Sequence, residues 1–266
     1  MKIINKFLSK ETKNFLVLKL QKKISKRLKI YFIPTVFDNL PTNNYHVQTD
    51  INYQKHLIRE FEKNKKINSF NTFSNIVELL NQISIKNSPS LNFLDFGGEN
   101  IDFYLDLNKN FKNLNYYVIN QGEINKTFIE IKKNYKFNNL NILENLNEVE
   151  KNSYDFINFG SSIQYINNYD DILTRVLKTS KKFIFFSGTH FYKNIDENKN
   201  KIVVKQINLL PKKFYCYFFN FEKFLFFFKK NNYSIFFNKF NATADISYKN
   251  FKNIKNIQYL DLLLSK

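Results

Sequence analysis

The sequence has few of the residues that build disulfides, metal sites or membrane spans. Its one cysteine, Cys216, excludes an intramolecular disulfide and any zinc site made of several cysteines. The three histidines, His46, His56 and His190, are widely separated and show no metal-ligand spacing. Apolar runs are short and flanked by lysine, so neither a signal peptide nor a transmembrane helix is predicted. These absences favour a soluble, cytoplasmic protein without a bound metal.

Acidic residues are also scarce relative to basic ones. The chain has 41 Lys and Arg against 23 Asp and Glu, a formal net charge of +18. Such an excess suits nucleic-acid binding when the basic residues cluster. Here most are lysines scattered among Asn, Ile and Phe, whereas phosphate recognition often uses the planar fork of arginine. A solvated basic surface is therefore favoured, and a nucleic-acid-binding or RNA-modifying protein stays open as the third hypothesis.

Aromatic residues are abundant, and they make a packed core possible. The chain is 43% hydrophobic and 18% aromatic, with 31 Phe, so disorder throughout is excluded.

Residues 1–30 alternate lysine with apolar residues at helical spacing. This pattern predicts a basic amphipathic helix that packs on the core or, alternatively, makes peripheral contact with an anionic membrane. We assign residues 1–50 to a basic N-terminal extension, with a loop between Pro34 and Pro41, and residues 51–266 to one domain.

The middle of the chain alternates short apolar runs with helical segments. Helices are predicted from Asp50 to Lys66 and from Phe70 to Ile83. Strands alternating with helices indicate an α/β fold with a doubly wound, Rossmann-like parallel sheet. The expected strands are Leu91–Phe96, Tyr116–Ile119, Asn141–Leu143, Phe156–Phe159 and Phe183–Phe186. The expected core includes Leu94, Phe96, Val118, Ile157, Phe159, Ile184 and Phe186.

The C-terminal part has a different pattern. Strands are predicted at Lys201–Leu209, Tyr233–Lys239 and Ile257–Leu264, with a helix at Phe221–Lys230. We expect the strands to add an antiparallel edge to the sheet. The aromatic run Phe214–Phe228 is compatible with a cover over the site, a packed sheet edge or a dimer face.

Two turns at predicted strand ends carry the candidate chemistry. The first strand ends in Asp95-Phe96-Gly97-Gly98, and the glycines allow a backbone to approach a ligand closely. The fourth strand is followed by Gly160–Tyr165, which includes two serines, Gln164 and a phenol. In doubly wound sheets, ligands bind in the crevice at such strand ends. Each turn also has a plainer interpretation, because glycines are common in tight turns and serines often cap helices.

Together these motifs resemble the class I S-adenosylmethionine (SAM)-dependent methyltransferases. More narrowly, Leu94–Gly98 and Ser161–Tyr165 are similar to motifs of a bacterial methyltransferase family often associated with surface-glycan genes. The resemblance implies SAM as cofactor and O-methylation of a small-molecule or glycan-linked acceptor. It places the methionine end of SAM at the first turn, its ribose after the second strand, and both cofactor and acceptor beside the second turn. The implied cofactor-binding residues are Asp95, Gly97, Gly98, Glu99, Asn120, Gln121, Ser161, Ser162 and Gln164.

Two positions depart from the family pattern. Glu99 and the residues after it supply no third glycine, and Asn120 stands where an acid normally accepts from the ribose hydroxyls. A neutral amide accepts a weaker hydrogen bond than a carboxylate does. These departures motivate a second hypothesis, a methyltransferase-fold protein that has lost catalysis and serves in binding or assembly.

A hydroxyl acceptor would be helped by a general base. His190 follows the fifth strand and is the first candidate for a catalytic role, with Tyr165 as the second and Asp170 or Asp171 less favoured. A hydrogen-bonded histidine without a catalytic role is the alternative interpretation for His190.

Overall fold

The fold was analysed in a computed structural model of the chain. It describes residues 30–42, 55–59, 61–63, 74–83, 90–193, 199–207, 214–241, 246–248, 251, 254 and 256–266. The predicted helix over residues 1–30 lies outside the described residues, apart from its last residue. Of the helix predicted from Asp50 to Lys66, the described parts 55–59 and 61–63 are helical.

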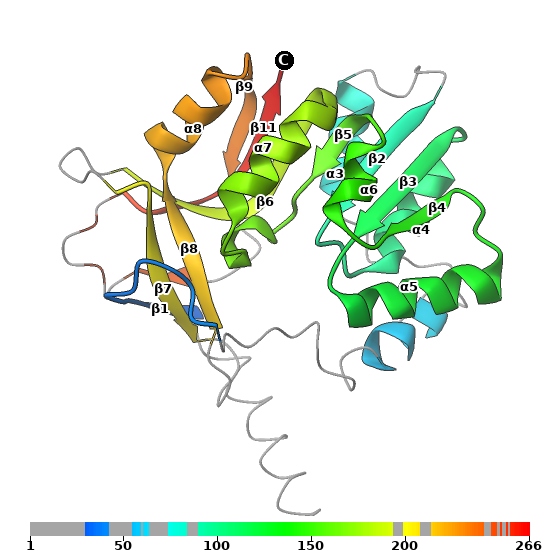
Figure 1. Cartoon of the computed structure of the whole chain (residues 1–266), viewed down its shortest axis with the longest axis horizontal. Helices are drawn as coiled ribbons and strands as arrows, with labels where there is room; N and C mark the ends of the chain where they lie inside the picture. Colours follow the sequence, from blue (N-terminus) through cyan, green and yellow to red (C-terminus); the bar gives the residue numbers. More distant parts are fainter. Residues whose placement is uncertain are drawn as a thin grey trace, which may run out of the picture.

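Five parallel strands form the central part of an 11-stranded sheet (Figure 1). Their order is β4-β3-β2-β5-β6, and every neighbouring pair is parallel. From β2 the chain adds β3 and then β4 on one side of the sheet. It then crosses back and adds β5 and β6 on the other side of β2, which confirms the doubly wound fold. All five predicted strands are present, at β2 (Leu91–Phe96), β3 (Leu114–Ile119), β4 (Leu140–Leu143), β5 (Tyr154–Asn158) and β6 (Ser180–Tyr192).

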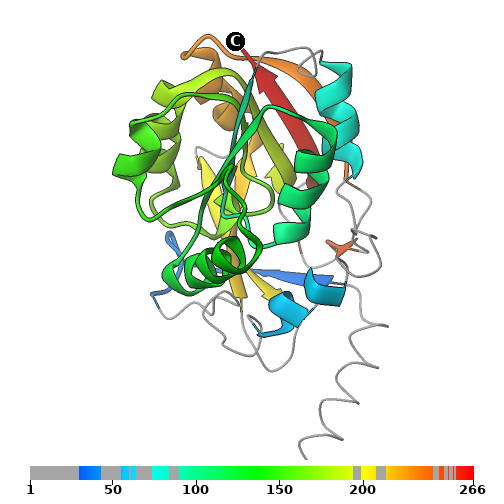
Figure 2. The ribbon, with the colours of Figure 1, turned by 90° about the vertical axis from the view of Figure 1, so that its right-hand side faces the viewer.

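Helices cover both faces of this sheet. One hydrophobic cluster joins its first face to α3 (Ser74–Gln82), α4 (Ile101–Asn110) and α5 (Gly122–Tyr135). A second cluster joins the other face to α6 (Leu146–Glu150), α7 (Tyr169–Thr179) and α8 (Phe221–Lys229). Figure 2 shows α3 in cyan and α7 in yellow-green on opposite sides of the sheet. The molecule therefore has three layers, as apolar strands flanked by amphipathic helices require.

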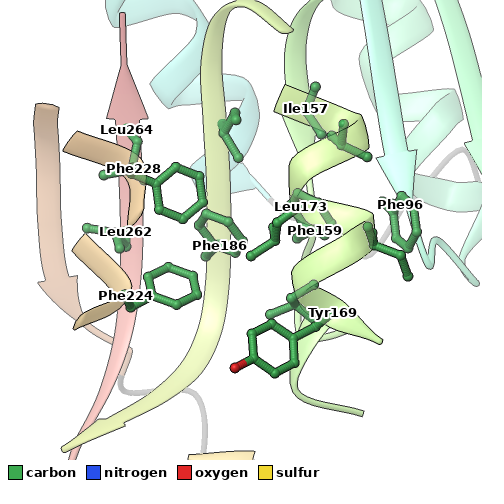
Figure 3. Close-up of a cluster of buried hydrophobic side chains, with 14 of the residues drawn as sticks. Phe96, Ile157, Phe159, Tyr169, Leu173, Phe186, Phe224, Phe228, Leu262 and Leu264 are labelled. Carbon is green, nitrogen blue, oxygen red and sulfur yellow. The ribbon is translucent and has the colours of Figure 1, made fainter. Parts of the chain in front are cut away.

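The core is built largely from aromatic rings. Phe186 stacks on Phe159 with centroids 5.0 Å apart and meets Phe224 and Phe228 of α8 edge-on (Figure 3). Such offset and edge-to-face pairs add to the free energy gained from burial. All seven residues predicted for the core are buried, none more than 7% exposed.

The predicted antiparallel edge is present. Strand β11 (Gln258–Ser265) runs antiparallel to β6 on one side and to β9 (Ser234–Phe240) on the other. The strand predicted at Lys201–Leu209 also forms, as β7 (Lys201–Ile207), but it does not join this edge. It pairs instead with β8 (Phe214–Asn220) and β1 (Ile30–Pro34).

Strands β1, β7 and β8 form a second arm of the sheet, seen around β7 and β8 in Figure 1. The two-residue strand β10 (Ile246–Ser247) pairs with β1 and completes it. The sequence does not predict β1, because Pro34 indicates a loop. Pro34 is the last residue of the strand, where the missing N–H of proline is tolerated. The aromatic run Phe214–Phe228 divides into strand β8 and helix α8.

The length of β6 explains why the sheet has two arms. Along one edge, its residues up to Phe185 pair with β5, and its last two residues, Phe191 and Tyr192, pair with β8. The same edge of β6 therefore changes partner beyond the end of β5. The short 3-10 helix η4 (Ile163–Tyr165) lies at this change and contacts both β6 and β8. No helix among the described residues is long and apolar enough to span a bilayer.

Candidate functional site

A cavity of about 730 Å³ lies along the carboxyl ends of the central strands. It reaches from Glu144, after β4, to Gln206 and Phe214 on β7 and β8. It thus passes β2 and β5, the neighbouring strands at which the winding direction reverses and where open α/β sheets bind ligands. Nine of the predicted site residues line it: Asp95, Gly97, Gly98, Glu99, Asn120, Gln121, Ser161, Ser162 and Tyr165.

The turn after β2 needs both of its glycines. Gly97 has a φ of +77°, and a Cβ atom there would lie 2.5 Å from Cβ of Ser162. A Cβ atom at Gly98 would collide with the Asp95 carboxylate. L side chains rarely adopt positive φ, so a larger residue would be strained at Gly97. At Gly98 a larger residue would have to displace the buried Asp95 side chain. The glycine pair therefore lets the backbone close tightly over Asp95.

Asp95 is a buried carboxylate at the centre of the site. It is 4% exposed, and its oxygens accept hydrogen bonds from the Tyr116 hydroxyl at 2.5 Å and from Asn158 Nδ2 at 2.8 Å. Burial raises the pKa of Asp95 to about 6, although both hydrogen bonds favour the charged form; the negative charge of Glu99 raises it further. No cation pairs with Asp95 among the described residues, so a positively charged ligand would relieve the cost of burying this charge.

Asn120 is committed to the local backbone. Its Nδ2 donates to the Gly98 carbonyl at 2.7 Å, and its Oδ1 accepts from the Gln121 N–H at 2.7 Å. The side chain thus connects the end of β3 to the glycine turn. Gln121 is exposed and precedes α5, and its side chain makes no capping hydrogen bond. Of the two predicted ribose contacts, Gln121 has the freer side chain.

The serines of the second turn hold the cavity wall together. Ser162 Oγ lies 2.8 Å from the Phe96 carbonyl and is also within hydrogen-bond reach of the Phe159 carbonyl. It thereby ties the turn after β5 to the turn after β2. Ser161 Oγ is exposed and donates to the Ser187 carbonyl at 3.3 Å. Ser162 is thus occupied with the backbone, whereas Ser161 lines the cavity and also makes a hydrogen bond with the Tyr259 hydroxyl.

Two predicted residues, Gln164 and His190, differ from their expected roles. Gln164 and His190 are absent from the cavity lining: Gln164 Nε2 donates to the Gly188 carbonyl at 3.2 Å, and the His190 ring packs on Phe218. Burial lowers the pKa of His190 to about 3. Its Nδ1 lies 3.1 Å from the Tyr248 hydroxyl, so His190 belongs to the apolar core of the second arm and we no longer assign it as the base.

Tyr165 does line the cavity, but burial raises the pKa of its phenol above the usual value, which disfavours the phenolate. Its hydroxyl donates to Gln206 Oε1 at 2.9 Å. Asp170 and Asp171 are exposed in the first turn of α7 and do not line the cavity. Among the described residues, no predicted base therefore stands over the cavity.

Sequence reasoning missed several lining residues. Asn158 Nδ2 donates to Asp95, and Asn158 Oδ1 accepts from the Gly160 N–H at 3.0 Å. Its position at the end of β5, directly before the predicted turn, was the signal that could have identified it. Glu144, Asn145 and Leu146 directly follow the weak third strand, and the same strand-end rule would have found them. Gln206 and Phe214 come from the second arm, whose position required the three-dimensional structure.

The charges of the cavity are opposite in sign to the net charge of the chain. Among the residues that the structure describes, its lining includes Asp95, Glu99 and Glu144 but no lysine, arginine or histidine. Asp95 lies near the end of β2, Glu99 follows β2, and Glu144 follows β4; none of the three belongs to η4, β7 or β8. The cavity thus has an acidic end and a neutral end.

Comparisons with known proteins returned structural similarities only. No protein-family model matches the chain. No curated protein matches it in sequence.

Many solved structures are similar in fold, and they include the following three. A SAM-dependent methyltransferase from Clostridium acetobutylicum is 12% identical, with 79% of this chain and 98% of that one covered and a TM-score of 0.49. Magnesium protoporphyrin IX methyltransferase from Synechocystis PCC 6803, with bound SAM, is 10% identical, with 82% and 85% covered and a TM-score of 0.48. The cyclase SpnF is 9% identical, with 72% and 80% covered and a TM-score of 0.49.

Proposed function

We propose that the protein binds SAM in this cavity and transfers its methyl group to a small-molecule or glycan-linked acceptor. The observation that carries the proposal is the charge of the cavity at the switch point of the sheet, three acids without a lysine, arginine or histidine among the described lining residues. SAM carries a sulfonium and an ammonium against one carboxylate, so its net charge is positive. Dinucleotides and nucleoside triphosphates carry negative phosphates, which such a lining repels.

The residues present fit the parts of SAM. The Asp95–Gly98 turn and Glu99 supply negative charge and close backbone approach for the methionine end. Helix α4 begins at Ile101 shortly after this turn, and the positive end of its dipole favours a carboxylate. Gln121 offers an amide to the ribose, and Leu146, with Glu144 beside it, offers apolar and polar contacts to the base.

The reaction that this site supports depends on alignment. SAM supplies an electrophilic methyl group when bound. As the bond from methyl carbon to acceptor oxygen forms, the bond to sulfur breaks, and the acceptor proton passes to solvent water. Holding two reactants in line supplies much of the rate enhancement in such a displacement, so a histidine base is not required. We therefore keep O-methylation as the proposed reaction and assign the chain's own residues a binding and orienting role.

Calorimetric titration tests the proposal. We expect SAM to bind the purified protein in the micromolar range at pH 7.5, S-adenosylhomocysteine to bind more weakly because it lacks the sulfonium charge, and ATP not to bind. The matched variant Asp95→Asn keeps the side-chain shape and removes the charge, and it should weaken SAM binding more than S-adenosylhomocysteine binding. Binding of ATP in preference to SAM would refute the proposal.

One observation favours a second candidate function, a non-catalytic binding protein with this fold. Asn120 stands where the resemblance leads us to expect an acid, and both polar atoms of its amide are used by the backbone. A weakened ribose contact would lower affinity for the cofactor. A folded protein that binds neither SAM nor S-adenosylhomocysteine would support this second function over the first.

A further inference from the structure

The neutral end of the cavity is created by the second arm of the sheet. Because β6 exchanges β5 for β8 as its neighbour, the crevice beyond the end of β5 is walled by η4 on one side and by β7 and β8 on the other. Gln206 and Phe214, which belong to these strands, line the same cavity as the glycine turn. A molecule bound here would lie beside the reactive end of a ligand placed at Asp95–Gly98.

The side chains at this end are uncharged and amphipathic. Ser161, Tyr165, Ser187 and Gln206 bring hydroxyl and amide groups, and Ile166 and Phe214 bring apolar surface. Hydroxyls both donate and accept, so they match a ligand that does the same. An aromatic ring beside such groups suits a ring compound with an apolar face and polar edges.

Gln206 presents an oriented hydrogen-bond donor. The side chain is only 7% exposed, and its Oε1 accepts from the Tyr165 hydroxyl at 2.9 Å. Its Nε2 has no hydrogen-bond partner in the described part of the chain, although the residue lines the cavity. Because the hydrogen bond from Tyr165 fixes the amide at the cavity wall, its Nε2 is available to donate to a ligand oxygen.

We propose that this end of the cavity is the acceptor subsite and that it takes an uncharged, polyhydroxylated ring, a neutral sugar unit. Gln206 Nε2 donates to a sugar oxygen, Tyr165 acts as a positioning residue by holding the amide, and Phe214 packs on the ring. The assignment of this pocket to a methyl acceptor rests on the proposed function. The preference for a neutral sugar rests on the lining alone.

The test uses ¹⁵N-labelled full-length protein and three probes, methyl β-D-glucopyranoside, D-glucuronate and D-glucosamine. The side-chain amide signals of Gln206 are identified by their loss in Gln206→Met, which keeps the length of the side chain and removes the donor. We expect the neutral glucoside to shift these signals saturably and to bind at least about tenfold more tightly than either charged sugar, since each charge would be desolvated without a partner. No shift with the glucoside, or equal binding of the three sugars, would overturn the proposal.

Variants separate a binding role from a structural one. Gln206→Met should weaken glucoside binding about threefold to tenfold, the range expected for one hydrogen bond, and Tyr165→Phe should weaken it by a smaller factor. Both should leave the affinity for S-adenosylhomocysteine unchanged, and both should lower the melting temperature slightly because the other partner of their shared hydrogen bond is left unpaired. Gln258→Met is the matched control, because Gln258 lies on β11 outside the cavity lining. Equal loss of glucoside binding in this control would overturn the assignment.

Each titration is made with and without S-adenosylhomocysteine. Glucoside binding in a protein that does not bind S-adenosylhomocysteine would refute the methyltransferase proposal and leave the sugar subsite standing. S-adenosylhomocysteine binding without glucoside binding would refute the sugar subsite alone.

Discussion

Replacing Asp95 by asparagine should make the protein more stable at neutral pH and weaken its binding of SAM. The wild-type side chain is 4% exposed and has no cationic partner among the described residues, so at neutral pH the folded protein buries an uncompensated charge. Asparagine has the same shape and keeps an oxygen for the Asn158 amide, and its NH₂ group can donate to Tyr116. The substitution therefore isolates the charge.

The size of the effect follows from the pKa of this group. The pKa of Asp95 is about 6 in the folded protein, against 3.8 for an unperturbed aspartate. Between these two values the folded state binds more protons than the unfolded state, so stability falls as the pH rises through this window. Each unit of difference between the two pKa values corresponds to about 1.36 kcal/mol. The free energy of unfolding of the wild type therefore falls by about 3 kcal/mol across this window, and that of Asp95→Asn does not.

Urea unfolding of both proteins from pH 4 to pH 7.5 measures this difference. The free energy of unfolding of Asp95→Asn minus that of the wild type should increase by about 2.4 kcal/mol between pH 4 and pH 7, and then stay constant. SAM affinity of the wild type should fall about tenfold from pH 7.5 to pH 5, as the carboxylate becomes protonated, and that of the variant should not change. A difference in unfolding free energy that is independent of pH would refute the reasoning.

Three further predictions concern the site and its support. Gly98→Ala should abolish SAM binding and lower the melting temperature, because the added methyl group collides with the Asp95 carboxylate; calorimetry and thermal unfolding measure both effects, and unchanged SAM affinity would contradict this account. The His190 ring should remain neutral from pH 5 to pH 8, because burial lowers its pKa to about 3; a ¹³C ring signal that titrates near pH 6.5 would contradict its buried position. Phe186→Ala should lower the free energy of unfolding by about 3 to 5 kcal/mol in urea, because the ring is fully buried between α8 and Phe159; a loss below about 1 kcal/mol would contradict this packing.

The central sheet could be predicted from the sequence because its strands are buried on both faces. Such strands are short apolar runs, and Leu91–Phe96 and Phe183–Phe186 stand out from the Lys- and Asn-rich segments around them. The glycine turn was equally visible, since only a residue without Cβ fits above Asp95. The local signals and the final fold agree at these positions.

The second arm was harder to predict because its partners are distant in the sequence. Strand β1 pairs with β7 across more than 160 residues, and no local pattern specifies such a pairing. The same limitation affected the assignment of His190. A histidine just after a strand core is compatible with a crevice, but β6 continues to Tyr192 and carries the ring into the core of the second arm. Which end of a long strand faces the ligand depends on that tertiary context.

A crystal structure of the protein grown with saturating SAM tests the central claim most directly. We predict density for SAM in the 730 Å³ cavity, with the methionine end at the Asp95–Gly98 turn and the methyl group directed toward Gln206. SAM bound elsewhere, or this cavity filled by a different ligand in preference to SAM, would contradict the claim.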